Sequence, residues 1–149
     1  MKIQTSFFGE VEYEQEDLLT FPKGLFGFEE EREFLPIPFN TDGTLYSLQS
    51  VRVSELSFTL MHPFSLDPDY APVLQKEELQ SLDVEKSEDL YYYVMCNVKD
   101  PVSQSTVNMK CPLAINPDTH VAFQVILDDS RWGMQQKLAD FGRQEGELC

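Results

Sequence analysis

Few residues in this chain have the chemistry that catalysis requires. There are two histidines: His62 ends one predicted strand and His120 begins another. A serine or cysteine nucleophile would have to be placed beside one of them, and the sequence contains no Gly-x-Ser-x-Gly elbow that could place a serine. We therefore interpret both histidines as surface or hydrogen-bonded residues, and we predict that the chain is not an enzyme.

The metal-binding and phosphate-binding patterns are equally weak. Asp67-Pro68-Asp69 resembles a fragment of a Ca²⁺ loop, but the glycine and the later ligands of such a loop are missing. We interpret it as a turn that the Asp67 side chain caps. Acidic residues follow the glycines Gly24 and Gly27, and they would repel a phosphate group. We predict no cofactor and no metal. The alternative is a small enzyme or ligand-binding barrel that uses His62, His120 and the turn at Asp67 and Asp69.

Strong acidity separates this chain from an average one. Among 149 residues there are 26 acidic and 11 basic side chains, which gives a net charge of −15 at pH 7. Nucleic acids and anionic membranes attract basic clusters, so we predict that the chain binds neither directly. Acidity promotes solubility, and it also accelerates encounters with a basic protein partner.

The acidic residues are concentrated near the N-terminus, where nine stand between residues 10 and 33 beside two basic ones. Three of them alternate with other residues and so share one face of a predicted strand. Three more directly follow two phenylalanines. Charged residues beside apolar ones are typical of protein interfaces, although a solvated acidic face and buried phenylalanines remain the alternatives. The residues that we expect to contact a partner are Glu10, Glu12, Glu14, Phe26, Phe28, Glu29, Glu30, Glu31, Phe64, Asp69 and Tyr70.

Two segments, 61–70 and 106–117, contain prolines and end predicted strands. In the second segment Asn108 and Asn116 stand among apolar residues, and a buried amide must be hydrogen-bonded. We expect these amides to hold the loops, with ligand contact as the alternative. The residues that we expect to have structural roles are Gly24, Gly27, Asn108, Pro112 and Asn116.

Short runs of β-branched and aromatic residues between turn signals predict strands along most of the chain. Two prolines restrict the run at 33–39 to an edge strand, and the turn at 40–43 predicts a hairpin with the run at 44–50. The strands expected are 3–8, 10–14, 17–21, 33–39, 44–50, 56–62, 91–98, 105–110 and 120–127. In the last of these, every second residue should share one apolar face: Val121, Phe123, Val125 and Leu127.

Helix signals are few. Residues 76–82 predict a short helix with Leu79 and Leu82 on one side. Residues 132–141 predict either a helix that buries Leu138 and Phe141 and stops at Gly142, or a polar tail. The fold class expected is therefore all-β: a single small β-barrel-like domain or sandwich of about eight to ten short antiparallel strands with one or two short helices. We expect the domain to cover 1–132, and residues 133–149 to form a C-terminal helix or flexible tail.

The cysteine pattern and the N-terminus indicate a reducing compartment. Cys96, Cys111 and Cys149 are odd in number and form no CxxC motif, so we expect no disulfide framework, with Cys149 as an exposed thiol. The N-terminus lacks the apolar core of a signal peptide, and no apolar run is long enough to span a membrane. We predict a cytoplasmic monomer.

Six segments in order resemble the family of the flagellar assembly factor FliW, and the resemblance covers about residues 3–132. In this sequence they read FGEVEY (8–13), FPKGLFGFE (21–29), LQS (48–50), PF with PDY (63–64 and 68–70), STVNMKCPLAIN (105–116) and QVIL (124–127).

This resemblance implies a non-enzymatic cytoplasmic regulator with a small β-barrel-like fold. Members bind flagellin before its export, and the expected contact is the flagellin C-terminal segment. They also bind CsrA, a basic translational repressor of flagellin, and relieve that repression once flagellin has left. The alternative within the family is a flagellin-specific chaperone without a CsrA role. An amphipathic flagellin helix would need an apolar groove in which to lay its apolar face.

Overall fold

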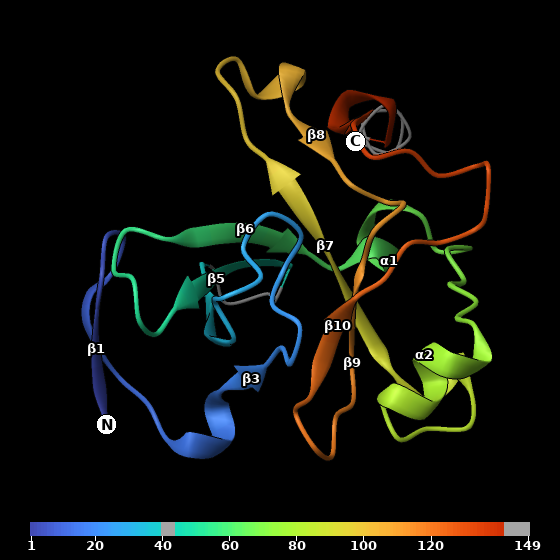
Figure 1. Cartoon of the computed structure of the whole chain (residues 1–149). Coiled ribbons are helices and arrows are strands. Elements are labelled where there is room, and N and C mark those ends of the chain that lie inside the picture. Colours follow the sequence, from blue (N-terminus) through green and yellow to red (C-terminus); the bar gives the residue numbers. More distant parts are fainter. Residues whose placement is uncertain (40–43, 142–149) are drawn as a thin grey trace.

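The structure is a computed structural model, and it describes residues 1–39 and 44–141. One long path of paired strands forms the main sheet, and a separate hairpin, β1 (Lys2–Thr5) with β2 (Gly9–Glu12), packs beside it (Figure 1). In spatial order the main sheet contains β10 (Ala122–Gln124), β9 (Leu113–Ile115), β7 (Tyr91–Asn97), β6 (Ser57–Met61), β5 (Leu45–Ser50), β4 (Glu33–Pro38) and β3 (Leu19–Thr20). Two further short strands continue from β7: β8 (Thr106–Val107), and β11 (Gln136–Lys137), which pairs with β8.

The hairpin expected from residues 33–39 and 44–50 is confirmed as β4 and β5. Its turn at 40–43 lies outside the described residues. The prediction that this run is an edge strand is wrong for Glu33 and Phe34, which pair with β3, and holds only for the part of β4 after them. Pro36 and Pro38 of β4 therefore lie opposite no residue of β3, so their missing N–H groups remove no hydrogen bond between these two strands.

The central strand is β7, which crosses the middle of the molecule and separates two parts of the core (Figure 1). Because side chains alternate along a strand, Tyr92 and Val94 join one cluster and Tyr93 joins the other. The first cluster includes Tyr70 and Trp132, and all of its buried residues come from the stretch 70–132. A third, smaller cluster fixes the β1–β2 hairpin on the sheet through Ile3, Leu18 and Leu35, with help from Val11 and Ile37.

Several strands are shorter than expected, and two were missed, β9 and β11. The run at 105–110 forms only β8, and the run at 120–127 forms only β10. Strand β9 follows directly after Pro112, in a stretch that we interpreted as a proline-containing loop. The expected apolar face is nevertheless confirmed. All four of its residues pack on the Tyr70–Trp132 cluster: Val121, Phe123, Val125 and Leu127.

The helices are short, as expected: α1 (Pro63–Leu66), α2 (Lys76–Ser81) and the 3₁₀ turns η1 (Gln15–Asp17), η2 (Ser87–Asp89) and η3 (Val102–Gln104). The predicted helix at 76–82 is confirmed as α2, with Leu82 buried just after its end. Near the C-terminus, β11 occupies part of 132–141, and the helical residues begin only at 138. Leu138 and Phe141 do pack on the core, whereas Gly142 and Cys149 lie outside the described residues.

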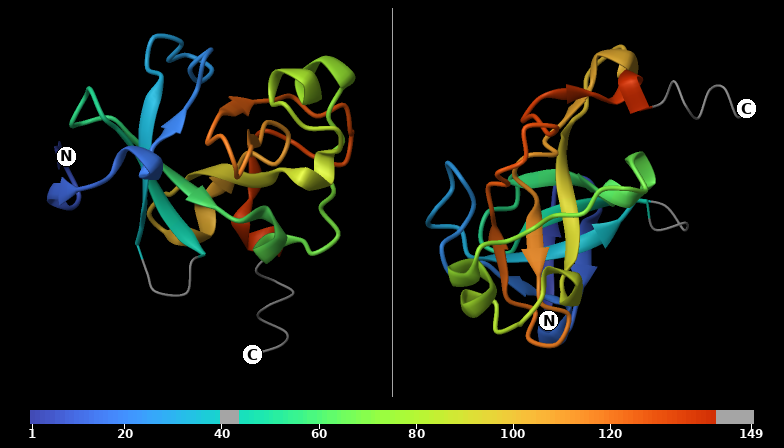
Figure 2. Two further views of the ribbon diagram at one scale, coloured as in Figure 1. Left: turned by 90° about the horizontal axis from the view of Figure 1, so that it is seen from below. Right: turned by 90° about the vertical axis from the view of Figure 1, so that its right-hand side faces the viewer.

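The all-β fold class with short helices is confirmed, and the sheet is curved without closing into a barrel (Figure 2). Among the described residues, the backbones of its two ends meet where Thr20 N donates to His120 O at 2.9 Å, beside an isolated parallel bridge between Thr20 and Val121. The described residues contain eleven strands, slightly more than predicted, because three of them have two residues each. Within residues 1–39 and 44–141, no helix has the length and apolar character needed to cross a bilayer.

Candidate partner-binding surfaces

The loop at 21–31 is built from two tight turns that place Phe26 at a tip. Gly24 N donates to Phe21 O at 2.9 Å, which closes a turn over Pro22 and Lys23. In the second turn, the backbones of Leu25 and Phe28 exchange two hydrogen bonds across the two residues between them. Leu25 is buried and anchors the loop, so the residue after it points outward. The alternative that Phe26 belongs to the core is thereby wrong, because half of this residue (50%) is exposed.

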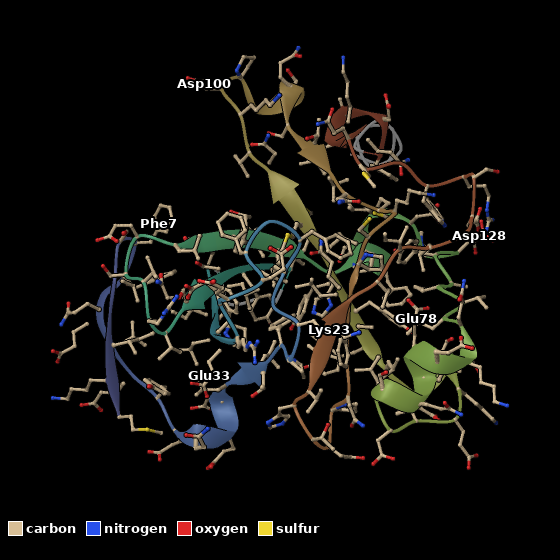
Figure 3. The ribbon with its side chains drawn as sticks, in the orientation of Figure 1. Phe7, Lys23, Glu33, Glu78, Asp100 and Asp128 are labelled. Carbon is tan, nitrogen blue, oxygen red and sulfur yellow. The ribbon has the colours of Figure 1, made fainter. Side chains whose placement is uncertain are left out.

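A groove of about 310 Å³ lies beside this tip. Its apolar surface comes from Phe26 and Phe123, and Phe26 N donates to the Gln124 side chain at 2.9 Å, which ties the loop to β10. Helix α2 supplies the other wall, and Figure 3 shows Lys23 and Glu78 on the two sides. The complete lining is Lys23, Phe26, Glu77, Glu78, Ser81, Phe123 and Gln124. Sequence reasoning missed this juxtaposition, since the three segments are far apart in the chain.

Phe28 is exposed to a similar degree, but its environment differs. Its ring meets the ring of Phe58 edge-on, with centroids 5.2 Å apart. One side of Phe28 therefore supports the sheet while the other faces solvent. Of the two phenylalanines, Phe26 is the better candidate for contact with a partner protein, because its side chain has no such aromatic partner among the described residues.

The acidic residues after Phe28 have separate tasks. Glu29 accepts a hydrogen bond from Gly27 N at 2.9 Å and so stabilises the tip. Glu30 is exposed. Glu31 forms an ion pair with Arg52, and the Arg52 hydrogen bond holds the pKa of the Glu31 carboxyl below its usual range. Of these three side chains, only Glu30 is exposed and has neither a hydrogen bond nor an ion pair among the described residues. Because Arg52 neutralises Glu31, the negative charge at this site is smaller than the sequence suggests.

The acidic face expected on the N-terminal strand is present in part. Glu10 and Glu12 are exposed on β2 and flank Lys2, whose Nζ lies 3.6 Å and 3.8 Å from their carboxylates. Glu14 lies beyond the end of β2, and its side chain caps η1 together with Asp17. The shared face therefore consists of Glu10 and Glu12, partly neutralised by Lys2, and not of all three glutamates.

The segment at 62–70 contains one correction. Phe64 is 44% exposed and Asp69 is exposed, whereas Tyr70 is only 2% exposed. The Tyr70 ring packs on Trp132, and its hydroxyl donates to Met109 O at 2.7 Å. Tyr70 was expected among the exposed contacts, but in the structure it is a core residue. Asp67 caps its turn as expected, since its side chain accepts from Asp69 N at 2.9 Å.

The two asparagines hold loops, and no ligand is needed to explain them. Asn116 is buried; its amide donates to Leu82 O at 2.7 Å, and its oxygen accepts from Asp118 N at 2.8 Å. Asn108 accepts from Cys111 N at 2.9 Å. Pro112 is buried, and its carbonyl accepts a hydrogen bond from Val125 N at 3.0 Å. This bond joins the residue before β9 to the residue after β10.

The histidines occupy unrelated places. His62 packs against the rings of Tyr46 and Tyr93, and burial lowers its pKa. His120 has a positive φ of 62° and contributes its carbonyl to the bond with Thr20. Neither has a serine or cysteine hydrogen-bonded to its ring among the described residues. In that part of the chain, moreover, no cluster of three His, Cys, Asp or Glu side chains could hold a metal ion.

An aromatic cluster was also missed. Phe7 and Phe8, in the β1–β2 turn, meet Phe39 at the end of β4 with centroid distances of 6.0 Å and 5.3 Å. Phe7 is 66% exposed, at the edge of the molecule opposite Lys23 and Glu78 (Figure 3). The sequence signal was the Phe-Phe-Gly run, for which we predicted only a strand over 3–8.

Comparison with known proteins places this architecture in one family. The family model described as FliW protein matches residues 2–138. A flagellar assembly factor FliW of Shouchella clausii is 36% identical over 143 residues, covering 96% of this chain and 98% of that protein. Another, from Syntrophomonas wolfei, is 38% identical over 130 residues, covering 87% and 83% of the two chains.

A solved structure agrees with the sequence relatives. The crystal structure of a flagellar assembly factor FliW superimposes with a TM-score of 0.83 at 31% identity, covering 93% of this chain and 96% of that one. The resemblance inferred from six ordered segments is thus confirmed over nearly the whole length. The chain belongs to the FliW protein family of flagellar assembly factors.

Proposed function

We propose that this flagellar assembly factor is a non-enzymatic cytoplasmic regulator that acts as a monomer and exchanges two protein partners. It binds the C-terminal segment of flagellin before export. Once flagellin has left, it binds the repressor CsrA and relieves the repression of flagellin synthesis. Because one protein holds the partners in turn, the two sites must overlap or be coupled.

The observation that carries the proposal is the exposed tip at Phe26, whose backbone is held by hydrogen bonds within the loop and to Gln124. The tip stands beside a groove whose apolar surface comes from Phe26 and Phe123 and whose other lining residues are polar or charged. An aromatic side chain that is held in place loses little entropy when it is buried by a partner, and such residues contribute most to binding. A flagellin segment that folds as an amphipathic helix has the matching apolar face. The net charge of −15 supports the second half of the proposal, because it favours a basic partner such as CsrA.

Calorimetric titration tests the proposal. The chain is titrated with the flagellin C-terminal segment, with CsrA, and with each in the presence of the other. We expect one-to-one binding of each and mutual exclusion. A stable ternary complex would contradict the exchange. Binding of flagellin alone would leave a flagellin chaperone without a CsrA role, and binding of neither would reject both partners.

A matched pair of variants locates the flagellin contact. Phe26→Ala should weaken flagellin binding by roughly tenfold, as expected for a central aromatic contact. Ile126→Ala is the control, since Ile126 is exposed to a similar degree (53% against 50%) outside the groove. Equal effects of the two substitutions would remove Phe26 from the binding surface.

A further inference from the structure

A second groove, of about 410 Å³, lies between the β1–β2 hairpin and the part of β4 that β3 does not cover. The hairpin lies at the end of the molecule opposite α2 (Figures 1 and 2). It is distinct from the groove at Phe26, because the two share no residue. Its lining combines apolar side chains, carboxylates and two prolines: Val11, Glu12, Tyr13, Glu16, Asp17, Leu35, Pro36, Ile37 and Pro38.

The backbone of β4 presents acceptors, without donors, to this groove. Phe39 N donates to Leu45 O and Val51 N donates to Glu33 O, so the odd-numbered residues of β4 bond to β5. In an antiparallel strand the backbone groups of the alternate residues point to the opposite edge. Those residues are Pro36 and Pro38, which β3 does not reach. Each offers a carbonyl oxygen and has no N–H.

The side chains around this edge have the same character. Glu12 and Glu16 are exposed, and the side chain of Glu12 is 79% accessible. Asp17 adds a carboxylate, one oxygen of which accepts from Glu14 N at 2.8 Å. The only basic side chain that contacts these acids among the described residues is Lys2, 3.8 Å from Glu12. The apolar wall is formed by half-buried Val11, Tyr13 and Ile37.

This combination selects one kind of occupant. A peptide strand added to β4 would find no donors for its own carbonyls, so strand addition is disfavoured. A metal ion is disfavoured as well, since no three acidic, histidine or cysteine side chains in the described part of the chain converge on one point. A guanidinium group fits: it carries five N–H donors and no acceptor, its stem is apolar, and its plane stacks on aromatic rings such as that of Tyr13.

We propose that the groove between β2 and β4 binds an arginine side chain on an otherwise apolar segment of a basic partner protein. The guanidinium donates to the Glu12 and Glu16 carboxylates and to the outward carbonyls of Pro36 and Pro38. Its methylenes lie on Val11 and Ile37. The identification of that partner as CsrA rests on the proposed function, whereas the chemistry of the groove does not.

The test uses the full chain and a defined peptide probe. The ¹⁵N–¹H spectrum of the chain is recorded during titration with acetyl-Leu-Arg-Ile-Arg-Leu-amide, and with the same peptide in which citrulline replaces arginine. Citrulline keeps the shape and removes the charge. We expect the arginine peptide to shift the amides of Val11, Glu12, Tyr13 and Ile37. The citrulline peptide should bind about tenfold more weakly, because the charge-assisted bonds are lost.

A matched pair of double variants separates the effect of the groove carboxylates from the effect of the net charge of the chain. Glu12→Gln with Glu16→Gln should weaken the arginine peptide by roughly three- to tenfold, the range for two partly exposed ion pairs. Glu85→Gln with Glu88→Gln removes the same charge from exposed positions elsewhere and should leave the affinity unchanged. Lys2→Met should strengthen binding, since it removes the competing cation.

Three results would overturn the inference: shifts spread evenly over all acidic surfaces, equal binding of the citrulline peptide, or no shifts at millimolar peptide. The same variants are then titrated with CsrA. If the peptide maps to the groove but CsrA does not bind the wild-type chain, the inference stands and the proposed partner is wrong. If CsrA binds and the groove variants leave its affinity unchanged, the proposed function stands and CsrA does not use this groove.

Discussion

At the scale of single residues, the space around a glycine Cα decides how much a substitution disturbs the loop at 21–31. Both Gly24 and Gly27 have positive φ, at 66° and 87°. A Cβ at Gly24 would lie 2.5 Å from Phe28 O, whereas a Cβ at Gly27 would meet nothing within 4 Å. The two positions therefore share the strain of the left-handed conformation, and only Gly24 has a steric conflict with backbone.

The first prediction follows from this contrast. Gly24→Ala should lower the free energy of unfolding by about 2–4 kcal/mol, since left-handed strain and a backbone clash add together. Gly27→Ala should lower it by only about 1 kcal/mol, from strain alone. Urea unfolding followed by the fluorescence of buried Trp132 measures both. Equal losses for the two variants would show that the loop moves to accommodate a methyl group.

His62 provides a pH-dependent prediction. Burial against two tyrosine rings lowers its pKa, so the folded chain holds the neutral ring. Below the ordinary histidine pKa of about 6.5, the unfolded chain gains a proton that the folded chain does not. The contribution of His62 to the free energy of unfolding should therefore be fully present above about pH 6.5. It should decrease as the pH falls from there toward the pKa of His62 in the folded chain. The lowered carboxyl pKa values of Glu31 and Asp129 affect a more acidic range.

The measurement compares urea midpoints at about pH 7.5 and about pH 5.5. His62→Phe should lose less stability between these pH values than the wild-type chain. His120→Asn is the control, because asparagine tolerates the positive φ found there. An unchanged pH dependence in His62→Phe would assign the effect to other groups.

At the scale of elements, the C-terminal part of the described chain is tied to the core. Strand β11 pairs with β8, and Leu138 N donates to Ser105 O at 2.9 Å. Leu138 and Phe141 pack on the cluster that contains Trp132. The residues after β11 thus cover apolar surface that would otherwise face water.

Two truncated chains test this role. A chain that ends at Lys137 should be less stable than one that ends at Phe141 by about 1–3 kcal/mol, because it loses two partly buried apolar side chains. Thermal unfolding of the two chains measures the difference directly. Identical melting temperatures would mean that residues 138–141 contribute no stability, which would favour the flexible tail over the helix, the two alternatives that the sequence left open for 133–149.

At the scale of the whole molecule, net charge governs the approach of partners more than their final affinity. A charge of −15 attracts a basic protein over distances comparable to the Debye length, which is about 8 Å at physiological salt. The ion pairs inside the chain are exposed and local, as for Lys2 with Glu10 and Arg131 with Asp129. They leave most of the net charge directed toward solvent.

The association rate with CsrA should therefore fall by about tenfold or more as salt rises from about 50 mM to about 500 mM. Stopped-flow or surface-based kinetics measure this rate, and the flagellin segment is the comparison, since apolar contacts dominate its expected binding. A CsrA association rate that does not change with salt would exclude electrostatic attraction from the mechanism.

The amino-acid sequence by itself determined the features that depend on neighbouring residues. The aromatic and β-branched run at 91–98 predicted β7, the turn at 40–43 predicted the β4–β5 hairpin, and the Leu79–Leu82 spacing predicted α2. The ordered segments also indicated the family. Each of these signals acts over a few residues, where backbone geometry and side-chain period are decisive.

Only the tertiary structure decided which side chains are free to meet a partner. Tyr70 and Phe26 both looked like exposed aromatics, yet Tyr70 is buried against Trp132 and Phe26 is held outward by a tight turn. Likewise, the acceptor-rich edge at Pro36 and Pro38 exists because β3 is too short to cover it. Burial and exposure depend on which distant segments pack together, and that is settled by the free energy of the whole core and not by any local pattern.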